Sequence, residues 1–273
     1  MELLSLLTDT LGPKILSGLQ FEATRYAMGT LTVFIFIWVL LGRFIRSRKI
    51  RARTPKFDQI KREIRNSMIT ICIFVALDIA VFEFESFGIF KIYGDAAGHS
   101  ALYFWLSIPM MLILHDTYFY WTHRMMHHPK LYKAFHMTHH RSHNPTPFAA
   151  YSFAPGEAVV EYAFVPVVLM IVPIHHSAFF IVMTIMIFKN ALGHCGYEVM
   201  PRRWARLPVL GWITSVTHHD MHHEKASGNY SLYFTWWDRW MGTEHANYLE
   251  RFETAGQAPK SAAPKTPPLI AAE

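Results

Sequence analysis

The residues of this chain best suited to chemistry are histidines. The sequence contains 17 of them, and eight fall into three groups with helical spacing. Residues three and four apart stand on one face of a helix with Cβ atoms about 5–6 Å apart, so their imidazoles can converge on metal ions. The three groups are His123 and His127; His136, His139 and His140; and His219, His222 and His223.

Further candidates lie near these groups. Asn190 and His194 form another i, i+4 pair, in which His194 is a predicted ligand and Asn190 a possible one. His115, one turn before the first group, is a possible ligand or an outer partner. Carboxylates often fix the orientation of a ligand imidazole through its second nitrogen. The carboxylates predicted for that role are Asp116, Asp220 and Glu198, followed by Asp238.

The number of histidines favours a particular metal content. Imidazole binds zinc, copper, iron and nickel, so the ligand type alone does not choose among them. A zinc site usually takes four ligands, whereas eight or nine nitrogens can serve two six-coordinate ions with positions left open. Two iron ions are therefore the favoured interpretation, and zinc can replace iron in purified protein.

The elements that must position these histidines are predicted to be membrane helices. The chain has 273 residues, of which 52% are hydrophobic and 17% charged, and this composition favours lipid contact. A span needs about 20 mostly apolar residues. The fold class predicted is all-α, a multi-span helical bundle. The candidate spans are Tyr26–Leu41, extending to Ile45; Met68–Phe90; Ala101 to about Trp121; and a hairpin of Val159–Ile174 and Ser177–Leu192, pinched at Pro173, His175 and His176. The two helices of the hairpin are short, which leaves re-entrant or partly inserted helices open as the alternative.

Charge predicts the orientation. The stretch Arg43–Arg65 holds ten Lys or Arg residues against Asp58 and Glu63, which is typical of a cytoplasmic loop. The third span ends at the first histidine group. The hairpin between residues 159 and 192 crosses twice or not at all, so the third histidine group returns to the same side. We therefore expect the three histidine groups, called histidine boxes below, to form a metal-binding dome on the cytoplasmic side of the membrane. Topology and anionic lipids explain the net charge of +6, so no nucleic-acid partner is expected.

The chain divides into three predicted parts. Residues 1–66 hold the N-terminal segment, the first span and the basic loop, 67–250 form the catalytic domain, and 251–273 form a disordered tail rich in Ala and Pro. The first 19 residues lack a basic region and a cleavage site, so no removable signal peptide is expected. Cys72 and Cys195 do not make a disulfide framework.

Three segments carry a family resemblance. HDTYFYWTHRMMHHPKLYKAFHMTHHRSHNPTPFAAYSFAP (115–155), NALGHCGYE (190–198) and HHDMHHEKASGNYSLYFTWWDRWMGT (218–243) resemble the fatty acid hydroxylase and sterol desaturase superfamily, whose boxes read H-x3-H, H-x2-H-H and H-x2-H-H in this order. The resemblance covers about residues 70 to 245. Within the superfamily, NPTPFAAYSFAP is similar to the P-T-P-F-A-S-x-A-F-x-P segment of ring-B sterol desaturases. It departs from that segment at Ala150 and Ala154, where serine and histidine are expected.

The resemblance implies a site and an activity. The family's metal ligands fall on the eight boxed histidines and His194, where two iron ions would use O2 to oxidise an unactivated C–H bond of a lipid, giving an alkene or an alcohol. Electrons must come from a reductase or a small electron carrier, because the sequence has no dinucleotide-binding motif, haem attachment motif or cysteine cluster. Basic residues that could attract an acidic carrier are Lys130, Lys133, Arg141, Arg202, Arg203 and Arg206.

Other functions remain open on the sequence alone. The same metal centre could hydroxylate fatty acyl, sphingoid or carotenoid chains. A metal transporter or a zinc-stabilised membrane scaffold are alternatives of another class. A transporter needs ionisable residues at membrane depth, and Asp78 is the obvious candidate there, whereas the boxes lie beyond the ends of the spans.

Overall fold

The chain is almost entirely helical. The computed structural model describes residues 6–85, 87–94 and 98–257. Among them the strands are β1 (Ile92–Tyr93) and β2 (Ile174–His175), which pair in parallel with Ile92 opposite Ile174. The predicted all-α class is confirmed. The α-helices are α2 (Gly12–Phe34), α3 (Phe57–Glu85), α4 (Ala101–Met126), α5 (Pro129–Phe135), α6 (Met137–His140), α7 (Pro155–Tyr162), α8 (Phe164–Ile171), α9 (His176–Gly193), α10 (Val216–Lys225), α11 (Trp236–Trp240) and α12 (Tyr248–Glu253).

The first span is longer than the sequence suggested. Helix α2 continues into π-helical turns, and the whole stretch Asp9–Leu40 is long and apolar enough to cross a membrane. The prediction covered only its second half, starting at Tyr26. Glu22 and Arg25, one turn apart, form a buried ion pair of 2.5 Å, and pairing lowers the cost of charges inside a span. These charges belong inside the span and do not end it.

Two further helices are long and apolar enough to span a membrane. One is Phe57–Phe84 in α3, and the other is α9. The sequence placed the start of the second span at Met68 and assigned Arg62 and Arg65 to a loop. Both arginines instead belong to the first turns of α3. The integral membrane character is confirmed, while the basic loop is shorter than predicted.

The remaining predicted spans differ from the structure. Helix α4 is continuous over 26 residues but is not among the three helices that qualify as spans, and it carries His115 and Asp116 in its second half. The first half of the predicted hairpin is wrong as a single helix. It consists of α7 and α8, each of eight residues and separated at Ala163, which is too short to cross a bilayer. The predicted pinch at residues 173–176 coincides with β2.

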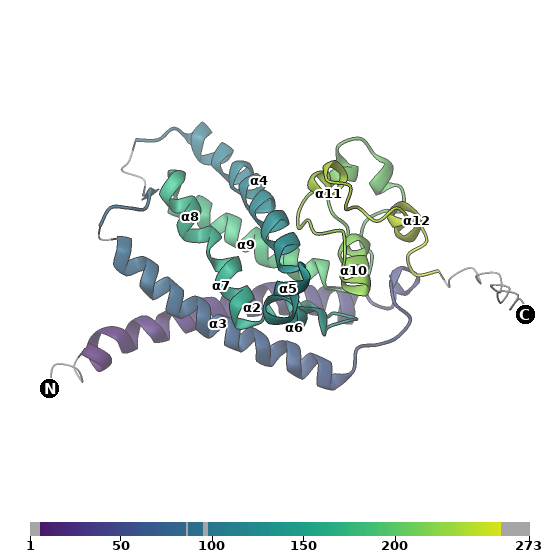
Figure 1. The fold of residues 1–273 in the computed structure, drawn as a ribbon, viewed down its shortest axis with the longest axis horizontal. Helices are drawn as coiled ribbons and strands as arrows, with labels where there is room; N and C mark the ends of the chain where they lie inside the picture. Colours follow the sequence, from purple (N-terminus) through teal and green to yellow (C-terminus); the bar gives the residue numbers. More distant parts are fainter. Residues whose placement is uncertain (1–5, 86, 95–97, 258–273) are drawn as a thin grey trace, which may run out of the picture.

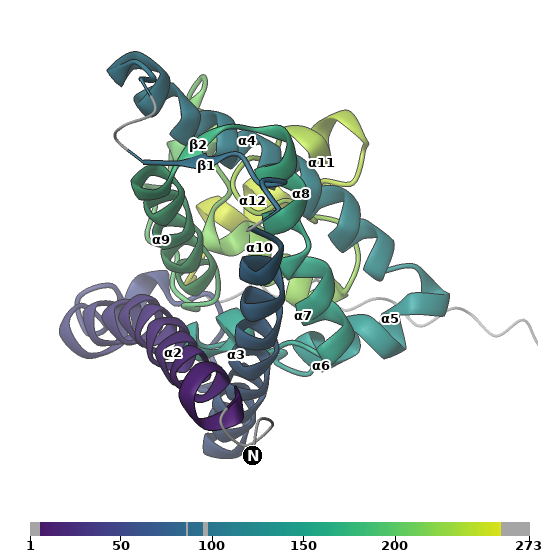
Figure 2. The ribbon, with the colours of Figure 1, turned by 90° about the vertical axis from the view of Figure 1, so that its left-hand side faces the viewer.

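Helix α2 packs against both α3 and α9, as Figures 1 and 2 show. Gly29 allows the close approach to α9, because a Cβ at this position would lie 2.7 Å from Ile187. A 3-10 turn, Pro147–Tyr151, packs against these three helices. Both Tyr26 and Ser67 donate hydrogen bonds to the carbonyl of Phe148. The membrane helices thereby fix the segment that follows the second histidine box.

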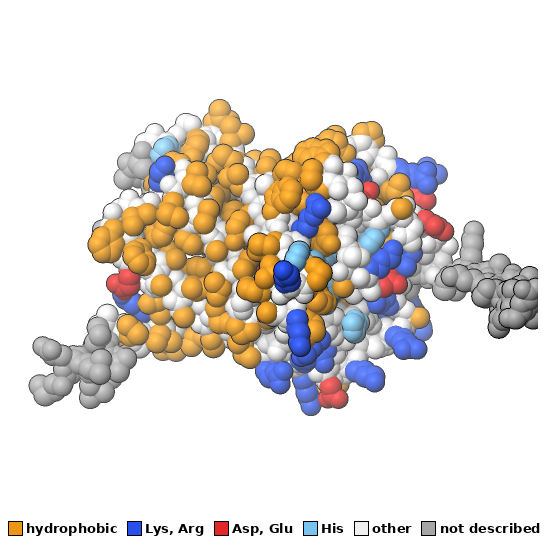
Figure 3. Space-filling model, viewed as in Figure 1, with side chains coloured by type: hydrophobic (Ala, Val, Ile, Leu, Met, Phe, Trp, Pro, Cys, Tyr) orange, Lys and Arg blue, Asp and Glu red, His pale blue; other side chains and the backbone are white. Residues whose placement is uncertain are grey.

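The surface is divided by polarity along the longest axis of the molecule. Large apolar side chains are exposed on α2, α3, α4 and α9, among them Phe21, Phe82 and Phe180. Figure 3 shows them covering one end, while Lys and Arg gather at the other, where Figure 1 places α10, α12 and the start of α3. The apolar end suits lipid, and the basic end forms the dome that holds the boxes.

The predicted tail begins later than residue 251. Helix α12 runs to Glu253, and Phe252 is fully buried in a cluster with Met221 and Tyr248. Burial of this aromatic ring ties the helix to α10, so the prediction of disorder is wrong for the first residues of the tail. Residues 258–273 lie outside the described residues.

Candidate metal centre

The nine histidines predicted as ligands come together in two clusters. Within each cluster, one ring nitrogen of every member lies within 4.8 Å of the others. The Nε2 atoms of His123 and His136 are 2.8 Å apart in the first, and those of His194 and His219 are 3.0 Å apart in the second. Nitrogens that converge in this way suit a shared ion. The first cluster is His123, His127, His136, His140 and His222; the second is His139, His194, His219 and His223.

Helical spacing decides which histidines share a cluster. Members of a box that are four residues apart lie in the same cluster, because they share a helix face more closely than members three apart. The third member of each longer box turns to the other cluster. The pairs at i, i+4 are His123 and His127, His136 and His140, and His219 and His223, while His139 and His222 are the crossing members.

Helix ends deliver these side chains. The first box closes α4, with His127 at its C-cap, and His194 is the C-cap of α9. Pro129 starts α5 directly after His128, and His128 caps that helix by accepting a hydrogen bond from the backbone N–H of Lys130. The third box lies on α10. The segments that carry the ligand histidines therefore meet in one place, the dome.

One loop orients three of the ligand rings. Carbonyl oxygens of residues 226, 228 and 230 face the Nδ1 atoms of three histidines. Because a carbonyl only accepts hydrogen bonds, each Nδ1 carries the proton and each Nε2 keeps its lone pair for a metal. The pairs are His127 with Ala226 at 3.0 Å, His222 with Gly228 at 2.7 Å and His123 with Tyr230 at 2.7 Å.

Asp238 holds this loop in shape. Its carboxylate accepts from the backbone N–H groups of Tyr230 and Ser231, each at 2.9 Å, and from the Thr243 hydroxyl at 2.7 Å. Ala226 has a φ of 50°, a conformation that a non-glycine residue keeps only when its surroundings impose it. Asp238 therefore acts on the ligand histidines through the loop and does not bond to their rings.

Glu157, which was not among the carboxylates predicted from the sequence, contacts a ligand ring directly. Glu157 Oε1 accepts from His136 Nδ1 at 2.6 Å, and the Glu157 side chain is 1% exposed. The signal available in the sequence is a glutamate two residues after Pro155, which predicts a helix start and no imidazole partner. This contact depends on the fold that brings α7 onto the second box.

The carboxylates predicted to orient the imidazoles have other partners, so that prediction is wrong for all three. Each is buried, and each accepts hydrogen bonds from backbone N–H groups or from an arginine. Asp116 accepts from Tyr233 N at 2.7 Å, Asp220 pairs with Arg51 at 2.8 Å, and Glu198 accepts from Thr217 N at 2.8 Å, at the start of α10. They shape the dome around the clusters.

The two other possible ligands also lie outside the clusters. His115 Nδ1 is 2.9 Å from the Tyr233 hydroxyl. The Asn190 amide donates to the carbonyl of Ala150 at 2.7 Å, and the Asn190 backbone carbonyl accepts from His194 Nδ1 at 2.7 Å. Asn190 thus orients a ligand ring through its backbone, while His115 belongs to the cavity described next.

Burial keeps the imidazoles neutral. Burial first, and neighbouring imidazoles second, hold the pKa of His219, His222 and His223 well below the ordinary value for histidine. A neutral imidazole binds a metal ion without first losing a proton. The donor set of the two clusters therefore fits first-row metal ions that accept nitrogen ligands.

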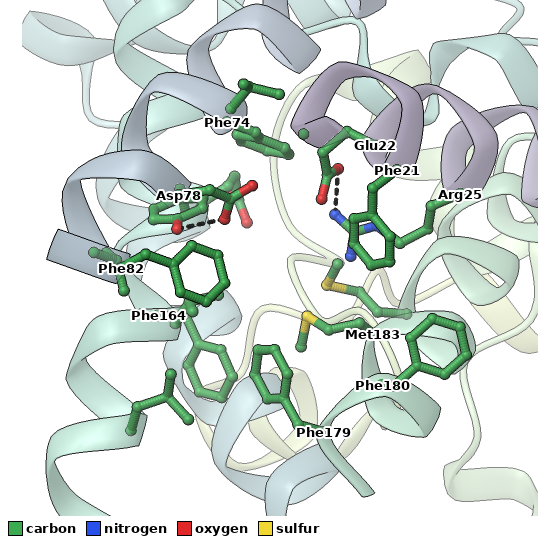
Figure 4. Close-up of a pocket in the computed structure, with 18 of the residues that line it drawn as sticks. Phe21, Glu22, Arg25, Phe74, Asp78, Phe82, Phe164, Phe179, Phe180 and Met183 are labelled. Atoms are coloured by element: carbon green, nitrogen blue, oxygen red, sulfur yellow. Dashed lines mark hydrogen bonds and ion pairs between the residues drawn. The ribbon is translucent and has the colours of Figure 1, made fainter. Parts of the chain in front are cut away.

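A large apolar cavity extends from the apolar end of the molecule toward the clusters. It has a volume of about 860 Å³, and its lining includes Phe119, Phe153 and Asn190. The Phe119 ring lies 4.9 Å from the ring of His123, and the Phe153 ring lies 5.5 Å from that of His139. These two rings therefore stand between the inner end of the cavity and the two clusters. Figure 4 shows the phenylalanines that line its outer part.

Comparison with known proteins agrees with this geometry. The sequence profile of the Fatty acid hydroxylase family matches residues 108–243, which include every histidine of both clusters. No solved structure matches the chain.

Three curated relatives illustrate the likeness. A Delta(7)-sterol 5(6)-desaturase of Gibberella zeae is 31% identical over 80% of this chain and 66% of its own length. The lathosterol oxidase of Homo sapiens is 28% identical over 78% of this chain and 70% of its own length. Methylsterol monooxygenase 1 of Rattus norvegicus is 26% identical over 86% of this chain and 79% of its own length. The chain spans about two thirds of the length of the first of these relatives.

Proposed function

Because this chain belongs to the fatty acid hydroxylase and sterol desaturase superfamily, we propose that it is a membrane oxidoreductase that uses O2 to desaturate or hydroxylate a sterol-like lipid. The observation that carries the proposal is the pair of histidine clusters at the inner end of an apolar cavity. Sterol desaturases and a sterol monooxygenase among its relatives support the substrate class.

Each cluster would hold one iron ion. The five-histidine cluster and the four-histidine cluster supply only nitrogen donors, which suit iron and also zinc. Iron bound there would supply the activation of O2 and the oxidation of an unactivated C–H bond. Electrons would come from an external reductase or small carrier, since the sequence carries no cofactor-binding motif for them.

The chain's own residues prepare the site for this chemistry. Phe119 and Phe153 line the inner end of the cavity beside the clusters with apolar surface, which would exclude water and hold a hydrocarbon close to the metal sites. Glu157 and the carbonyls of residues 226–230 fix the ring orientations before any ligand arrives. Placement of the reacting carbon between the two phenylalanines would decide between loss of a second hydrogen and gain of a hydroxyl.

Product analysis tests the proposal. The iron-loaded protein in nanodiscs should convert a Δ7-sterol, given a chemical reductant and isotopically heavy O2, into a product that has lost two hydrogens and carries no label. A labelled alcohol would keep the oxidoreductase and favour hydroxylation, as in the methylsterol monooxygenases. Failure to convert sterol, acyl or sphingoid lipids by protein with reduced iron would contradict the proposal.

The dome is proposed to face the cytoplasm. The basic residues of Arg43–Arg65 and the charged end of the molecule support this orientation. Arg141 beside the second box is exposed, so an Arg141→Cys variant in a Cys72→Ala background should react with a membrane-impermeant maleimide only from the cytoplasmic side. Native Cys195 is buried and should stay unlabelled. Labelling of Arg141→Cys from the opposite side alone would overturn the orientation.

A further inference from the structure

The cavity has a polar end at membrane depth. Figure 4 shows Glu22 and Arg25 on α2 facing Asp78 on α3 across an opening lined by phenylalanines. Glu22 pairs with Arg25 at 2.5 Å, and Asp78 accepts from the Tyr162 hydroxyl at 2.6 Å. Ionisable residues inside a membrane protein are costly and usually serve a ligand or an ion. None of these residues belongs to either histidine cluster, so they are available for another task.

Two donors at this end have no partner among the described residues. Arg25 Nε and the Tyr151 hydroxyl are both buried without a hydrogen bond. Arg25 is 8% exposed and Tyr151 2%, and both line the cavity. The Arg25 guanidinium lies over the Tyr151 ring, 5.9 Å from its centroid. A buried donor without an acceptor costs free energy, so both donors favour a ligand that brings an oxygen acceptor to this end of the cavity.

The charge at this end of the cavity favours one kind of oxygen-containing ligand group over another. Among the residues that line the cavity, Glu22, Asp78 and Glu161 offer three carboxyl groups against the one guanidinium of Arg25, and Lys14 is paired with Glu83 at the rim. A carboxylate or phosphate headgroup would add a negative charge to this excess. A hydroxyl can accept from the free donors and donate to a carboxylate, and it brings no charge.

We infer that Glu22, Arg25, Asp78 and Tyr151 form a binding site for the hydroxyl group of a neutral lipid alcohol, whose hydrocarbon part extends along the cavity to the histidine clusters. The inference rests on the proposed function for the fate of the lipid and on the cavity alone for its binding. Two aromatic rings, Tyr151 and Phe153, connect Arg25 to His139 through successive contacts. The hydroxyl site thereby sets which carbon of the alcohol reaches the metals.

The alcohol would enter from the bilayer. Phe21, Phe82 and Phe180 line the cavity, and each is about half or more exposed on the apolar surface of the molecule. The Phe21 and Phe180 rings lie 6.3 Å apart and join α2 to α9 at the rim. A membrane lipid can therefore reach the polar end without crossing water.

Equilibrium binding to the full-length protein in nanodiscs tests the inference without turnover. Tritiated cholestanol and hexadecanol would be compared with their hydroxyl-free counterparts, cholestane and hexadecane, and with palmitate. One hydrogen-bonded hydroxyl should make the better-fitting alcohol bind about tenfold tighter than its hydrocarbon. Cholestanol or hexadecanol as the preferred probe would each support the site and identify a sterol or a straight-chain alcohol as its source.

Tyr151→Phe is the sharpest variant, because it removes a hydroxyl that has no partner to leave behind. It should reduce the preference for alcohol over hydrocarbon to about threefold or less, and Arg25→Gln should do the same if it folds. Tyr118→Phe is the matched control, since its hydroxyl donates to the carbonyl of Val160 and does not line the cavity. This variant should keep the preference.

Three results would overturn the inference. They are equal binding of alcohol and hydrocarbon by the wild type, tighter binding of palmitate, or a full alcohol preference in both Tyr151→Phe and Arg25→Gln. Metal content would be measured on the same preparation. Selective alcohol binding by protein that fails to oxidise lipid would sink the proposed function alone, whereas lipid oxidation without selective alcohol binding would sink the hydroxyl site alone.

Discussion

Replacing His139 or His222 with alanine should lower bound metal and lipid oxidation together. The two histidines belong to different clusters, and each supplies an Nε2 atom at the centre of its group. Loss of an outer partner of a metal ligand already costs about 10–100-fold in affinity or activity, so loss of a ligand should reduce turnover by more than about 100-fold. Metal bound per chain would be measured by plasma mass spectrometry beside turnover.

His143→Ala is the matched control for these variants. His143 follows the second box by three residues but is exposed and belongs to neither cluster. It should retain wild-type metal content and turnover. If His139→Ala and His222→Ala also keep their full metal content, the two clusters are not metal sites.

Glu157→Gln should weaken metal binding while the fold survives. The carboxylate accepts the Nδ1 proton of His136 at 2.6 Å in a fully buried position, and it makes that imidazole a stronger donor to a metal. The neutral amide keeps the shape and an acceptor oxygen but loses the charge. We expect the metal to dissociate about 10–100-fold more readily, measured as metal retained during titration with a chelator.

Glu161→Gln, one turn later on α7, separates this effect from a general change in the helix. Within the described part of the chain, Glu161 makes no hydrogen bond or ion pair with a cluster histidine, and it lines the cavity. The retention of metal by Glu161→Gln should match that of the wild type. Equal retention by Glu157→Gln would show that the contact with His136 does not tune the metal.

Most of the candidate site could be predicted from the spacing of the histidines in the sequence. Spacing of three and four residues predicts convergent imidazoles for any helix, because it depends on local geometry alone. The same spacing also accounts for the division into two clusters. Members of a box four residues apart lie in one cluster, whereas His139 and His222 each lie in the other cluster. That the nine histidines bind metal remains a prediction.

Contacts between distant segments could not be read in this way. Glu157 meets His136 only because α7 folds back onto the second box, and the carbonyls of residues 226–230 orient three rings only because Asp238 shapes their loop. Asp116 and Asp220 looked suitable by their proximity to the boxes. Backbone N–H groups and Arg51 instead occupy their carboxylates.

The membrane helices show a related limit. A hydropathy scale counts the free-energy cost of placing each charged side chain in the membrane separately. Glu22 and Arg25 lower that cost because they form an ion pair. The first span was therefore predicted too short. In the same way, a continuous apolar run at residues 159–174 concealed the break at Ala163 that separates α7 from α8. The length of the first span and the break at Ala163 both depend on pairing and packing of side chains, which the sequence shows only indirectly.

Metal identity and stoichiometry test the central claim most directly. The full-length protein would be purified anaerobically in mild detergent and examined by plasma mass spectrometry and Mössbauer spectroscopy. The two clusters, of five and four histidines, predict close to two iron ions per chain, magnetically coupled and reducible. A single redox-inactive zinc ion that iron cannot replace would contradict the oxidoreductase account and point to a structural or hydrolytic role.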